Sequence, residues 1–510
     1  MKNKHLLLGI VFALLPSLTS TAQTEEEFEQ FRARKQAEFN HYREEKRKAF
    51  EEFRRQRNEE FAKYIRKKWK RIDSQPVLPK PKDDTVPPVV KPHDDPQPVT
   101  PPPAPKPRPY DEVIPAPAPT PQPQPIDPIE EQPEPSPVRP TFPTQSFSFF
   151  GTPGTVRIDK NKLLRLRSLN ENAIADAWLK FSEECYTNLI YDCLQIRKEH
   201  TLCDWAYLMM LKQMSEAVYG KHCNESELLM AYVYCQSGYK MRLATQNGKL
   251  LMLFASKHTI YDWTRYVIDG EYYYGMDRKN GDVMVCAQKY PKEQSLSLLI
   301  STEQQFALVA TTVSTHQSKR DADMKVSLKA NKNLLDFYTS YPTSMIGNNM
   351  VSRWAMYANT PMSSYVRQQV YPAIKSAISH CDQWTAVNKI LNFVQTGFVY
   401  EYDDKVWGDD RAFFAEESLH YPYCDCEDRS ILLTRIVRDL LGLKCILIFY
   451  PGHLAAAVEF TEGNPVGDCI VYNGRRFFIA DGTILGYGAP VGETMEGMDN
   501  KTAKVILLEE

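Results

Sequence analysis

The most regular pattern in the chain is a pair of aromatic series near its N-terminus. Both series step by eleven residues, and together they comprise Phe28, Phe39, Phe50 and Phe61, and Phe31, Tyr42, Phe53 and Tyr64. Eleven residues make three helical turns, so the pattern predicts a long amphipathic helix within residues 23–75, with one aromatic face and a weak right-handed supercoil. Because Glu, Lys and Arg fill the other faces, we expect residues 24–75 to form a coiled coil in a homo-oligomer. A solvated charged helix without a partner is the alternative.

A second pattern, near the C-terminus, predicts one helix followed by several strands. Apolar residues at helical spacing follow Cys426 and end before Gly442, which is a natural helix stop. The chain then alternates short apolar runs with turns, and Asn473-Gly474 is a strong signal for a two-residue hairpin. These runs predict strands over 443–450, from His453 to Phe460, and over 475–480, the last of which ends at Asp481.

The middle of the chain has weaker periodicity. Residues 283–330 alternate short apolar runs, such as 295–300 and 306–310, with polar turns, which predicts a small β segment. Residues 362–400 contain apolar side chains at four-residue spacing and predict helix. Helices and strands are therefore both expected, and the predicted fold class is α+β.

Proline separates the N-terminal helix from the rest. Of the 36 prolines, 26 lie between Pro76 and Pro143. Such a composition favours extended polyproline II, so we expect residues 76–145 to be a Pro-rich tether and the globular part to begin near residue 145. A ligand for proline-binding domains is the alternative for this segment.

The first residues indicate export. Lys2 and Lys4 precede an apolar run from Leu6 to Leu15, and small residues follow up to Ala22, which is typical of a secretory signal peptide over residues 1–22. An uncleaved membrane anchor is the alternative. We therefore expect a secreted or periplasmic protein of the cell envelope.

The charge and the cysteine content exclude two classes. A net charge of −2 argues against nucleic acid as a partner. Eleven cysteines without regular spacing do not form the framework of a small disulfide scaffold, and the odd number leaves at least one thiol free or paired between chains. The basic end of the N-terminal helix allows a peripheral contact with the cell envelope.

The candidate chemistry lies near the C-terminus. Cys426 is expected at a helix N-terminus, where free backbone N–H groups and the helix dipole favour a thiolate. His453 begins one predicted strand and Asp481 ends a neighbouring one, which suits a nucleophile, a base and an orienting carboxylate. Cys424 is a rival thiol. A Cys-x-Cys metal site is disfavoured because no second ligand pair lies nearby at zinc-site spacing, so neither a metal nor a cofactor is expected.

These residues resemble the transglutaminase-like superfamily of cysteine enzymes, which share the papain-like fold. The resemblance covers residues 385–495 and rests on the motifs Cys426-x-Asp428, Pro-Gly-His453 and Ala-Asp481-Gly-Thr. It implies that Cys426 is the nucleophile, that His453 is the general base and acid, and that Asp481 orients the imidazole. One departure from the family pattern is Cys424, which stands where many members have glycine.

The resemblance implies thiolate acyl transfer on the amide bonds of a peptide or protein substrate. Hydrolysis by a peptidase or amidase is favoured over cross-linking, because water needs no dedicated second-substrate site. The alternative from another class is a non-catalytic cell-envelope scaffold or binding protein with an inert triad.

Residues 223–277 look like a second, degenerate copy of the same pattern. Cys223 matches Cys426, Lys249 stands at the position of His453, and Asp277 matches Asp481. Lysine is protonated at neutral pH and is a poor base for a thiol, so we expect this copy to be non-catalytic. Coincidence of short patterns is the alternative. The predicted domains are a signal peptide (1–22), a charged helix (23–75), a Pro-rich linker (76–145), a degenerate transglutaminase-like domain (146–282), a β-rich segment (283–345) and a catalytic domain (346–510).

Overall fold

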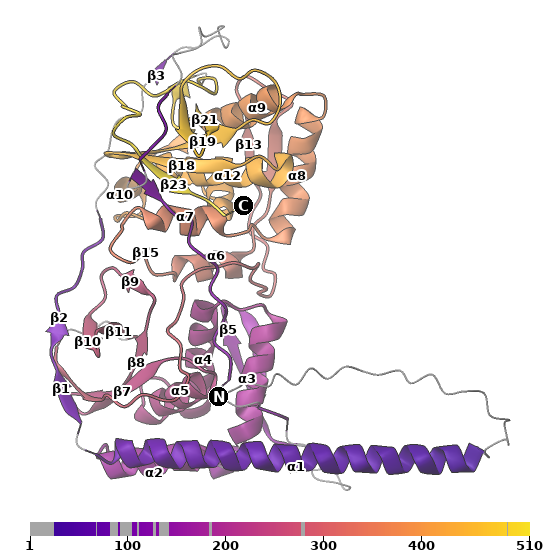
Figure 1. The fold of residues 1–510 in the computed structure, drawn as a ribbon, viewed down its shortest axis with the longest axis vertical. Coiled ribbons are helices and arrows are strands. Elements are labelled where there is room, and N and C mark those ends of the chain that lie inside the picture. The colour runs from indigo at the N-terminus through magenta and orange to yellow at the C-terminus, as the bar shows by residue number, and fades with distance from the viewer. Residues whose placement is uncertain are drawn as a thin grey trace. The chain divides into compact units, whose positions relative to one another are not determined.

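The computed structural model describes residues 25–67, 69–81, 90–91, 105–109, 112–125, 129–131, 142–182, 186–276, 281–486 and 488–509. The predicted signal peptide lies outside these residues. The chain divides into two compact units, Met1–Gln56 and Arg57–Glu510. The second unit contains both helices and sheets, so the predicted mixed α+β class is confirmed (Figure 1).

Helix α1 (Glu25–Ile65) is the long helix predicted from the aromatic series. Oppositely charged side chains three or four residues apart pair along it, as Lys48 and Glu44 do at 2.9 Å, and such pairs support an exposed helix. The aromatic residues in its first part are exposed, including Phe28, Phe31, Phe39 and Tyr42. The predicted self-association is not tested by a single chain and stays a prediction.

The first sheet has the strand order β1-β12-β7-β8-β11-β10-β2 among the described residues. Its strands are β1 (Lys70–Ile72), β2 (Ser74–Gln75), β7 (Met241–Gln246), β8 (Lys249–Ala255), β10 (Arg265–Ile268), β11 (Glu271–Gly275) and β12 (Val283–Cys286). Four helices accompany it: α2 (Glu171–Phe181), α3 (Thr187–Glu199), α4 (Asp204–Tyr219) and α5 (Asn224–Gln236). Helix α1 therefore ends before the predicted boundary at residue 75, and the residues after it become edge strands of this sheet.

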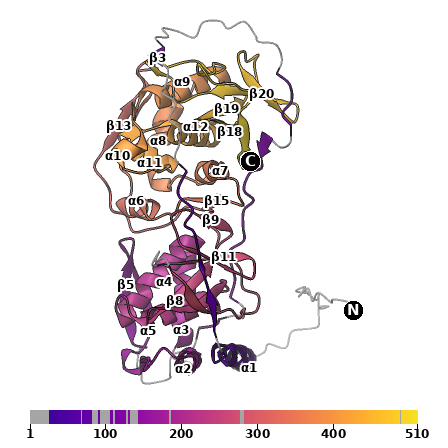
Figure 2. The ribbon, with the colours of Figure 1, turned by 90° about the vertical axis from the view of Figure 1, so that its left-hand side faces the viewer.

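The second sheet has the order β20-β21-β19-β18-β23-β4 among the described residues. Its strands are β4 (Val113–Ile114), β18 (Cys445–Tyr450), β19 (His453–Glu459), β20 (Cys469–Tyr472), β21 (Arg475–Ala480) and β23 (Lys504–Leu507). Helix α12 (Cys426–Leu441) packs against β18 and β19 (Figure 2). The predicted helix and strands of the C-terminal region are thus confirmed.

The remaining elements connect and cover the two sheets. The helices are α6 (Lys332–Thr339), α7 (Ser352–Asn359), α8 (Ser364–Ile378), α9 (Gln383–Thr396), α10 (Asp403–Val406), α11 (Ala415–His420) and the short η2 (Lys160–Lys162). The strands are β3 (Val90–Lys91), β5 (Thr144–Phe149), β6 (Thr152–Arg157), β9 (His258–Ile260), β13 (Ser314–Gln317), β14 (Lys325–Leu328), β15 (Ser344–Ile346), β16 (Val399–Tyr400), β17 (Tyr423–Cys424) and β22 (Leu485–Gly486).

The predictions for the middle of the chain are confirmed in part. Helices α8 and α9 occupy most of the region 362–400 predicted as helical, but Val399–Tyr400 form strand β16 instead. Strands β12, β13 and β14 occur in the predicted β segment, but residues 295–300 and 306–310 form only isolated bridges. An apolar alternation predicts which side of a segment is buried, whereas a strand also needs a continuous neighbouring edge, and these two runs have none.

Five strands of each sheet follow the same order, which supports the predicted internal repeat. In the first, β7 pairs antiparallel with β8, β8 with β11, β11 with β10, and β7 with β12. In the second, β18 pairs antiparallel with β19, β19 with β21, β21 with β20, and β18 with β23. A helix precedes each set directly, α5 in the first and α12 in the second.

The Pro-rich segment is not a free tether in its described parts. Residues 113–114 form β4, which pairs in parallel with β23 at an edge of the second sheet. Farther along, the Arg197 side chain donates a hydrogen bond to the backbone carbonyl of Pro123 at 3.0 Å. Polyproline II makes no internal hydrogen bonds, so its backbone is available for such contacts. The expectation that the globular part begins near residue 145 is therefore wrong, since the second unit begins at Arg57.

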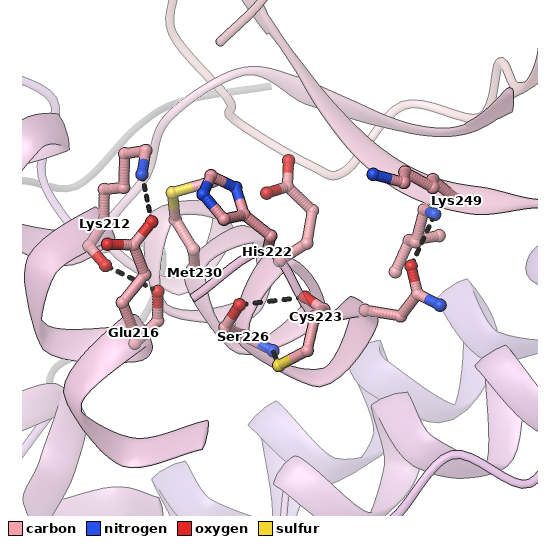
Figure 3. Close-up of a pocket in the computed structure, with 11 residues that line it drawn as sticks. Lys212, Glu216, His222, Cys223, Ser226, Met230 and Lys249 are labelled. Atoms are coloured by element: carbon pink, nitrogen blue, oxygen red, sulfur yellow. Dashed lines mark hydrogen bonds and ion pairs between the residues drawn. The ribbon is translucent and has the colours of Figure 1, made fainter. Parts of the chain in front are cut away.

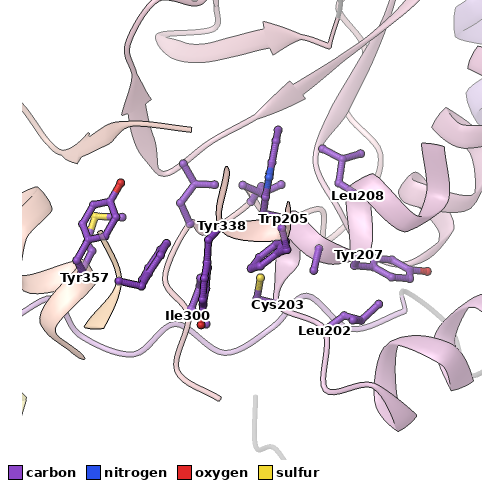
Figure 4. Close-up of a cluster of buried hydrophobic side chains, with 14 of the residues drawn as sticks. Leu202, Cys203, Trp205, Tyr207, Leu208, Ile300, Tyr338 and Tyr357 are labelled. Atoms are coloured by element: carbon purple, nitrogen blue, oxygen red, sulfur yellow. The ribbon is translucent and has the colours of Figure 1, made fainter. Parts of the chain in front are cut away.

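One hydrophobic core extends through both halves of the second unit. Figure 4 shows part of it, in which α4 and the residues just before it meet side chains from the later half of the chain. The labelled members are Leu202, Cys203, Trp205, Tyr207, Leu208, Ile300, Tyr338 and Tyr357. The halves that carry the two sheets are thus stabilised together.

Candidate active site

Helix α12 begins at Cys426, as predicted. The side chain of Asp428 holds this helix start in place. Its Oδ1 accepts a hydrogen bond from the backbone N–H of Phe413 at 2.7 Å, and its Oδ2 accepts one from that of Asp425 at 3.5 Å. Carboxylates that bind free backbone N–H groups stabilise a helix N-terminus. At the other end the helix stops at Gly442, whose φ is +64°.

His453 and Asp481 form a buried hydrogen-bonded pair. Nε2 of His453 lies 2.8 Å from Oδ2 of Asp481, and both side chains are 1% exposed. The other carboxylate oxygen, Oδ1, accepts a hydrogen bond from the backbone N–H of Thr483 at 2.9 Å. Burial would raise the pKa of Asp481, but His453 and Thr483 together hold the pKa below its ordinary value. The contact at Nε2 leaves Nδ1 of the imidazole for another partner.

The structure brings Cys426 to the strand that begins with His453. Burial raises the pKa of the Cys426 thiol, and the backbone N–H of Leu454, the residue after His453, acts against this rise. One turn along the helix, Ser430 Oγ donates a hydrogen bond to the backbone carbonyl of Leu454 at 3.0 Å. Helix α12, which carries Cys426 and Ser430, therefore packs on the strand that His453 begins, and Asp481 is paired with His453.

The electrostatic surroundings of Cys426 are the opposite of those expected from its place on a helix. Burial raises the pKa of the Cys426 thiol well above its usual range, and Glu427 and Asp425 raise it further. The thiol contacts Glu427 Oε2 at 3.1 Å. The expectation of a favoured thiolate is wrong here, because burial and two carboxylates outweigh the helix dipole. The rival thiol, Cys424, is fully buried, and burial raises its pKa to about 11.

Two buried side chains that were not predicted connect these elements. Arg429 donates to the backbone carbonyls of Gln395, Phe398 and Gly482. Gln395 in turn donates to the backbone carbonyl of Asp481 at 2.8 Å. These contacts join α12, α9 and the turn after β21, so they fix Asp481 relative to the helix that carries Cys426. In the sequence, the signal for these contacts was an arginine in the first turn of an apolar helix.

In the predicted degenerate copy, Cys223 lies at a small pocket (Figure 3). Cys223 caps helix α5, and its sulfur accepts a hydrogen bond from the backbone N–H of Ser226 at 3.4 Å. Lys249 is the first residue of β8, as His453 is of β19, and it lines the same small pocket as Cys223. Asp277, the predicted third member, lies outside the described residues.

Helix α5 is also joined to β8 through its side chains. Asn224 Oδ1 accepts a hydrogen bond from the backbone N–H of Leu250 at 2.9 Å, and Glu227 Oε1 accepts one from that of Met252 at 2.7 Å. The first copy thus keeps the contact between helix and strand with a lysine where the second copy has histidine.

Comparisons of the chain with family models, with curated proteins and with solved structures found no match. No helix in the described part of the chain is long and apolar enough to span a membrane.

Proposed function

We propose that the chain is an exported cysteine enzyme of transglutaminase-like type, whose papain-like C-terminal domain acts on amide bonds of peptides or proteins. The observation that carries the proposal is the buried His453–Asp481 pair, with 2.8 Å between Nε2 and Oδ2, beside the helix that begins with Cys426. An imidazole held by a carboxylate at one nitrogen can exchange a proton with a thiol at the other.

The chemistry follows from these roles. As the Cys426 sulfur attacks the amide carbon, its proton passes to His453, and the carbonyl oxygen becomes an oxyanion. The C–N bond then breaks, the amine leaves with the proton from His453, and a thioester remains. Water attacks the thioester with His453 as base, which releases the acid and restores the thiol. Because the pKa of Cys426 is raised, proton transfer accompanies the attack and no thiolate forms beforehand.

Hydrolysis is the favoured outcome, since water needs no binding site for a second substrate, whereas an amine acceptor would give a cross-link. The proposal includes export, because residues 1–22 are typical of a secretory signal peptide. The proposed homo-oligomer forms through the exposed aromatic residues of α1, and the basic end of that helix allows contact with the cell envelope.

A non-catalytic cell-envelope scaffold is the second candidate. The observation that favours it is the pair of acidic neighbours of Cys426, because Asp425 and Glu427 disfavour a thiolate. In that case the His453–Asp481 pair has a structural role only. The second copy keeps all three predicted residues, Cys426, His453 and Asp481, whereas the first copy has Lys249 in place of the histidine. This difference favours catalysis.

To distinguish the two candidate functions, a mixture of denatured proteins is incubated with the full chain. Mass spectrometry then detects new peptide termini, which indicate hydrolysis, or new isopeptide bonds, which indicate cross-linking. We expect new termini with the unmodified chain and with Cys424→Ala, and none with Cys426→Ala. The scaffold is favoured if a folded, unmodified chain yields neither product.

A further inference from the structure

The part of the Pro-rich segment after β4 lies on the protein with a regular period of three residues. Pro117 and Pro123 are buried, Thr120 between them is partly buried, and residues 118, 119, 121 and 122 are exposed. Polyproline II has three residues per turn, so every third side chain lies on the same face. Residues 117–125, which we name the strap, therefore turn one face toward the protein and the others toward solvent.

The later part of the strap is held where α3 ends and α4 begins. Arg197, in the last turn of α3, donates a hydrogen bond from Nη1 to the backbone carbonyl of Pro123 at 3.0 Å. Nε2 of Gln122 donates one to the backbone carbonyl of Leu202 at 2.6 Å, just before α4. Because polyproline II has no internal hydrogen bonds, its carbonyls are free for such a donor.

The guanidinium of Arg197 is fixed by groups that do not belong to the strap. The side chain is buried, and the guanidinium lies 5.1 Å from the ring centroid of Tyr207 and 5.3 Å from that of Tyr239. Nη2 lies 3.7 Å from Oδ1 of Asp204, which also accepts a hydrogen bond from the Tyr239 hydroxyl at 2.7 Å. Cation–π contacts and an ion pair thus hold the donor in one orientation.

Gly238 lets the backbone of the strap come close. A β-carbon at Gly238 would lie 1.9 Å from the backbone oxygen of Gln124, and the φ of this glycine is +91°. Gly442 is its counterpart in the second copy, and a β-carbon there would meet no atom of the described residues within 4 Å. The glycine that ends a helix in the second copy therefore has a further role in the first, since it admits the strap.

The strap and the surface beneath it also enclose free space. A cavity of about 600 Å³ is lined on the strap side by Thr120, Pro121, Gln122, Gln124 and Pro125. Its other wall includes Arg197, Lys198, Thr201, Asp204, Ser297 and Thr302, and we name this wall the groove. No strand pairing holds residues 117–125 in the described part of the chain, so the strap can leave the groove without breaking a sheet.

We propose that the groove is a binding site for polyproline II peptides, which the strap occupies in its own chain and which the strap of a second copy enters when the first is displaced. The occupant follows from the sequence seated there, because every copy of the chain carries the same segment. A tethered ligand competes at an effective concentration on the order of millimolar. A free peptide therefore binds weakly to the unmodified chain and more tightly to a chain whose strap is impaired.

The test is the binding of a fluorescent peptide, with the sequence of residues 115–125, to the full chain, measured by anisotropy. In the strap variant, Pro117→Ser is combined with Pro123→Ser, and we expect it to bind the peptide about tenfold more tightly than the unmodified chain. Adding Arg197→Gln to the strap variant should weaken binding about tenfold, because a hydrogen bond from a charged donor is lost. Adding Lys198→Gln instead is the matched control and should leave the affinity unchanged, since this exposed neighbour lines the same cavity.

Two results would overturn the proposal. If the peptide at millimolar concentration binds neither the unmodified chain nor the strap variant, the groove takes no ligand from a second copy and the strap is a fixed part of the fold. If Arg197→Gln leaves the affinity of the strap variant unchanged, the peptide binds elsewhere. Circular dichroism shows whether each variant folds. Gly238→Ala replaces an Arg197→Gln that does not fold, and Pro123→Ser alone replaces the double substitution.

Discussion

At the scale of single residues, the neighbouring groups decide whether a partly or fully buried group of the site has a raised or a lowered pKa. Burial acts on both Asp481 and Cys426, yet the pKa of Asp481 is lowered and that of Cys426 is raised. His453 and the Thr483 N–H stabilise the charged form of Asp481 and lower its pKa. Glu427 and Asp425 destabilise the charged form of Cys426 and raise its pKa. The resting site therefore holds an ionised carboxylate and a protonated thiol.

The lowered pKa of Asp481 predicts how stability depends on pH. A carboxylate with a depressed folded-state pKa stabilises the fold above its ordinary pKa, and this contribution is lost as the pH falls through the folded-state value. We expect Asp481→Asn to lower the free energy of unfolding by roughly 1–3 kcal/mol at pH 6. The difference between the two proteins should shrink as the pH falls below the ordinary pKa of an aspartate and through the lower folded-state value. Denaturant unfolding at several pH values measures it, and a pH-independent difference would contradict this assignment.

At the scale of elements, one aromatic series of α1 has two roles. Phe61, near the C-terminal end, is 4% exposed and packs between Trp178 and Tyr290, with ring centroids 5.0 and 5.3 Å away. Phe39, two steps earlier in the same series, is 59% exposed. The same pattern of eleven residues thus anchors one end of the helix and leaves aromatic rings exposed at the other.

The two positions predict opposite results for one substitution. Phe61→Ala should lower the free energy of unfolding by about 3–5 kcal/mol, because it empties a buried site. Phe39→Ala should leave stability within about 0.5 kcal/mol and should weaken self-association. Denaturant unfolding gives the first quantity and analytical ultracentrifugation of the full chain the second. If the full chain without any substitution is monomeric, the proposed homo-oligomer is wrong.

Elements whose signals are local could be predicted, and those that depend on distant partners could not. Gly442 ends α12, and Asn473-Gly474 makes its hairpin, because the required positive φ values are properties of those residues. Residues 113–114 carry no such signal, since they become β4 only by meeting β23 about 390 residues later. The raised pKa of Cys426 was equally inaccessible, because it arises from burial in the folded chain and from the side chains that gather around it.

At the scale of the whole molecule, the segments before residue 145 complete the second unit. Strands β1 and β2 extend the first sheet, and β4 extends the second. Phe61 and Ile65 belong to the shared core. The Pro-rich segment therefore follows two edge strands of the first sheet and supplies an edge strand, β4, of the second.

This arrangement predicts where the chain can be shortened. A chain of residues 57–510 should unfold at nearly the same temperature as the full chain. A chain of residues 145–510 should be less stable by more than the roughly 3–5 kcal/mol expected for Phe61 alone, because it also exposes three sheet edges, two in the first sheet and one in the second. Thermal unfolding of both chains measures the difference. Equal unfolding temperatures would show that the described N-terminal segments do not stabilise the sheets.

The central claim is that Cys426 reacts with the help of His453, and the most direct measurement is the rate of its acylation. An activated peptide ester that acylates thiols is mixed with the full chain, and intact-mass spectrometry follows the adduct over time. The account predicts a single adduct on Cys426, unchanged by Cys424→Ala and slowed about 10²- to 10⁴-fold by His453→Ala. Acylation of Cys426 at the same rate in His453→Ala, or an adduct on Cys223 in its place, would contradict the account.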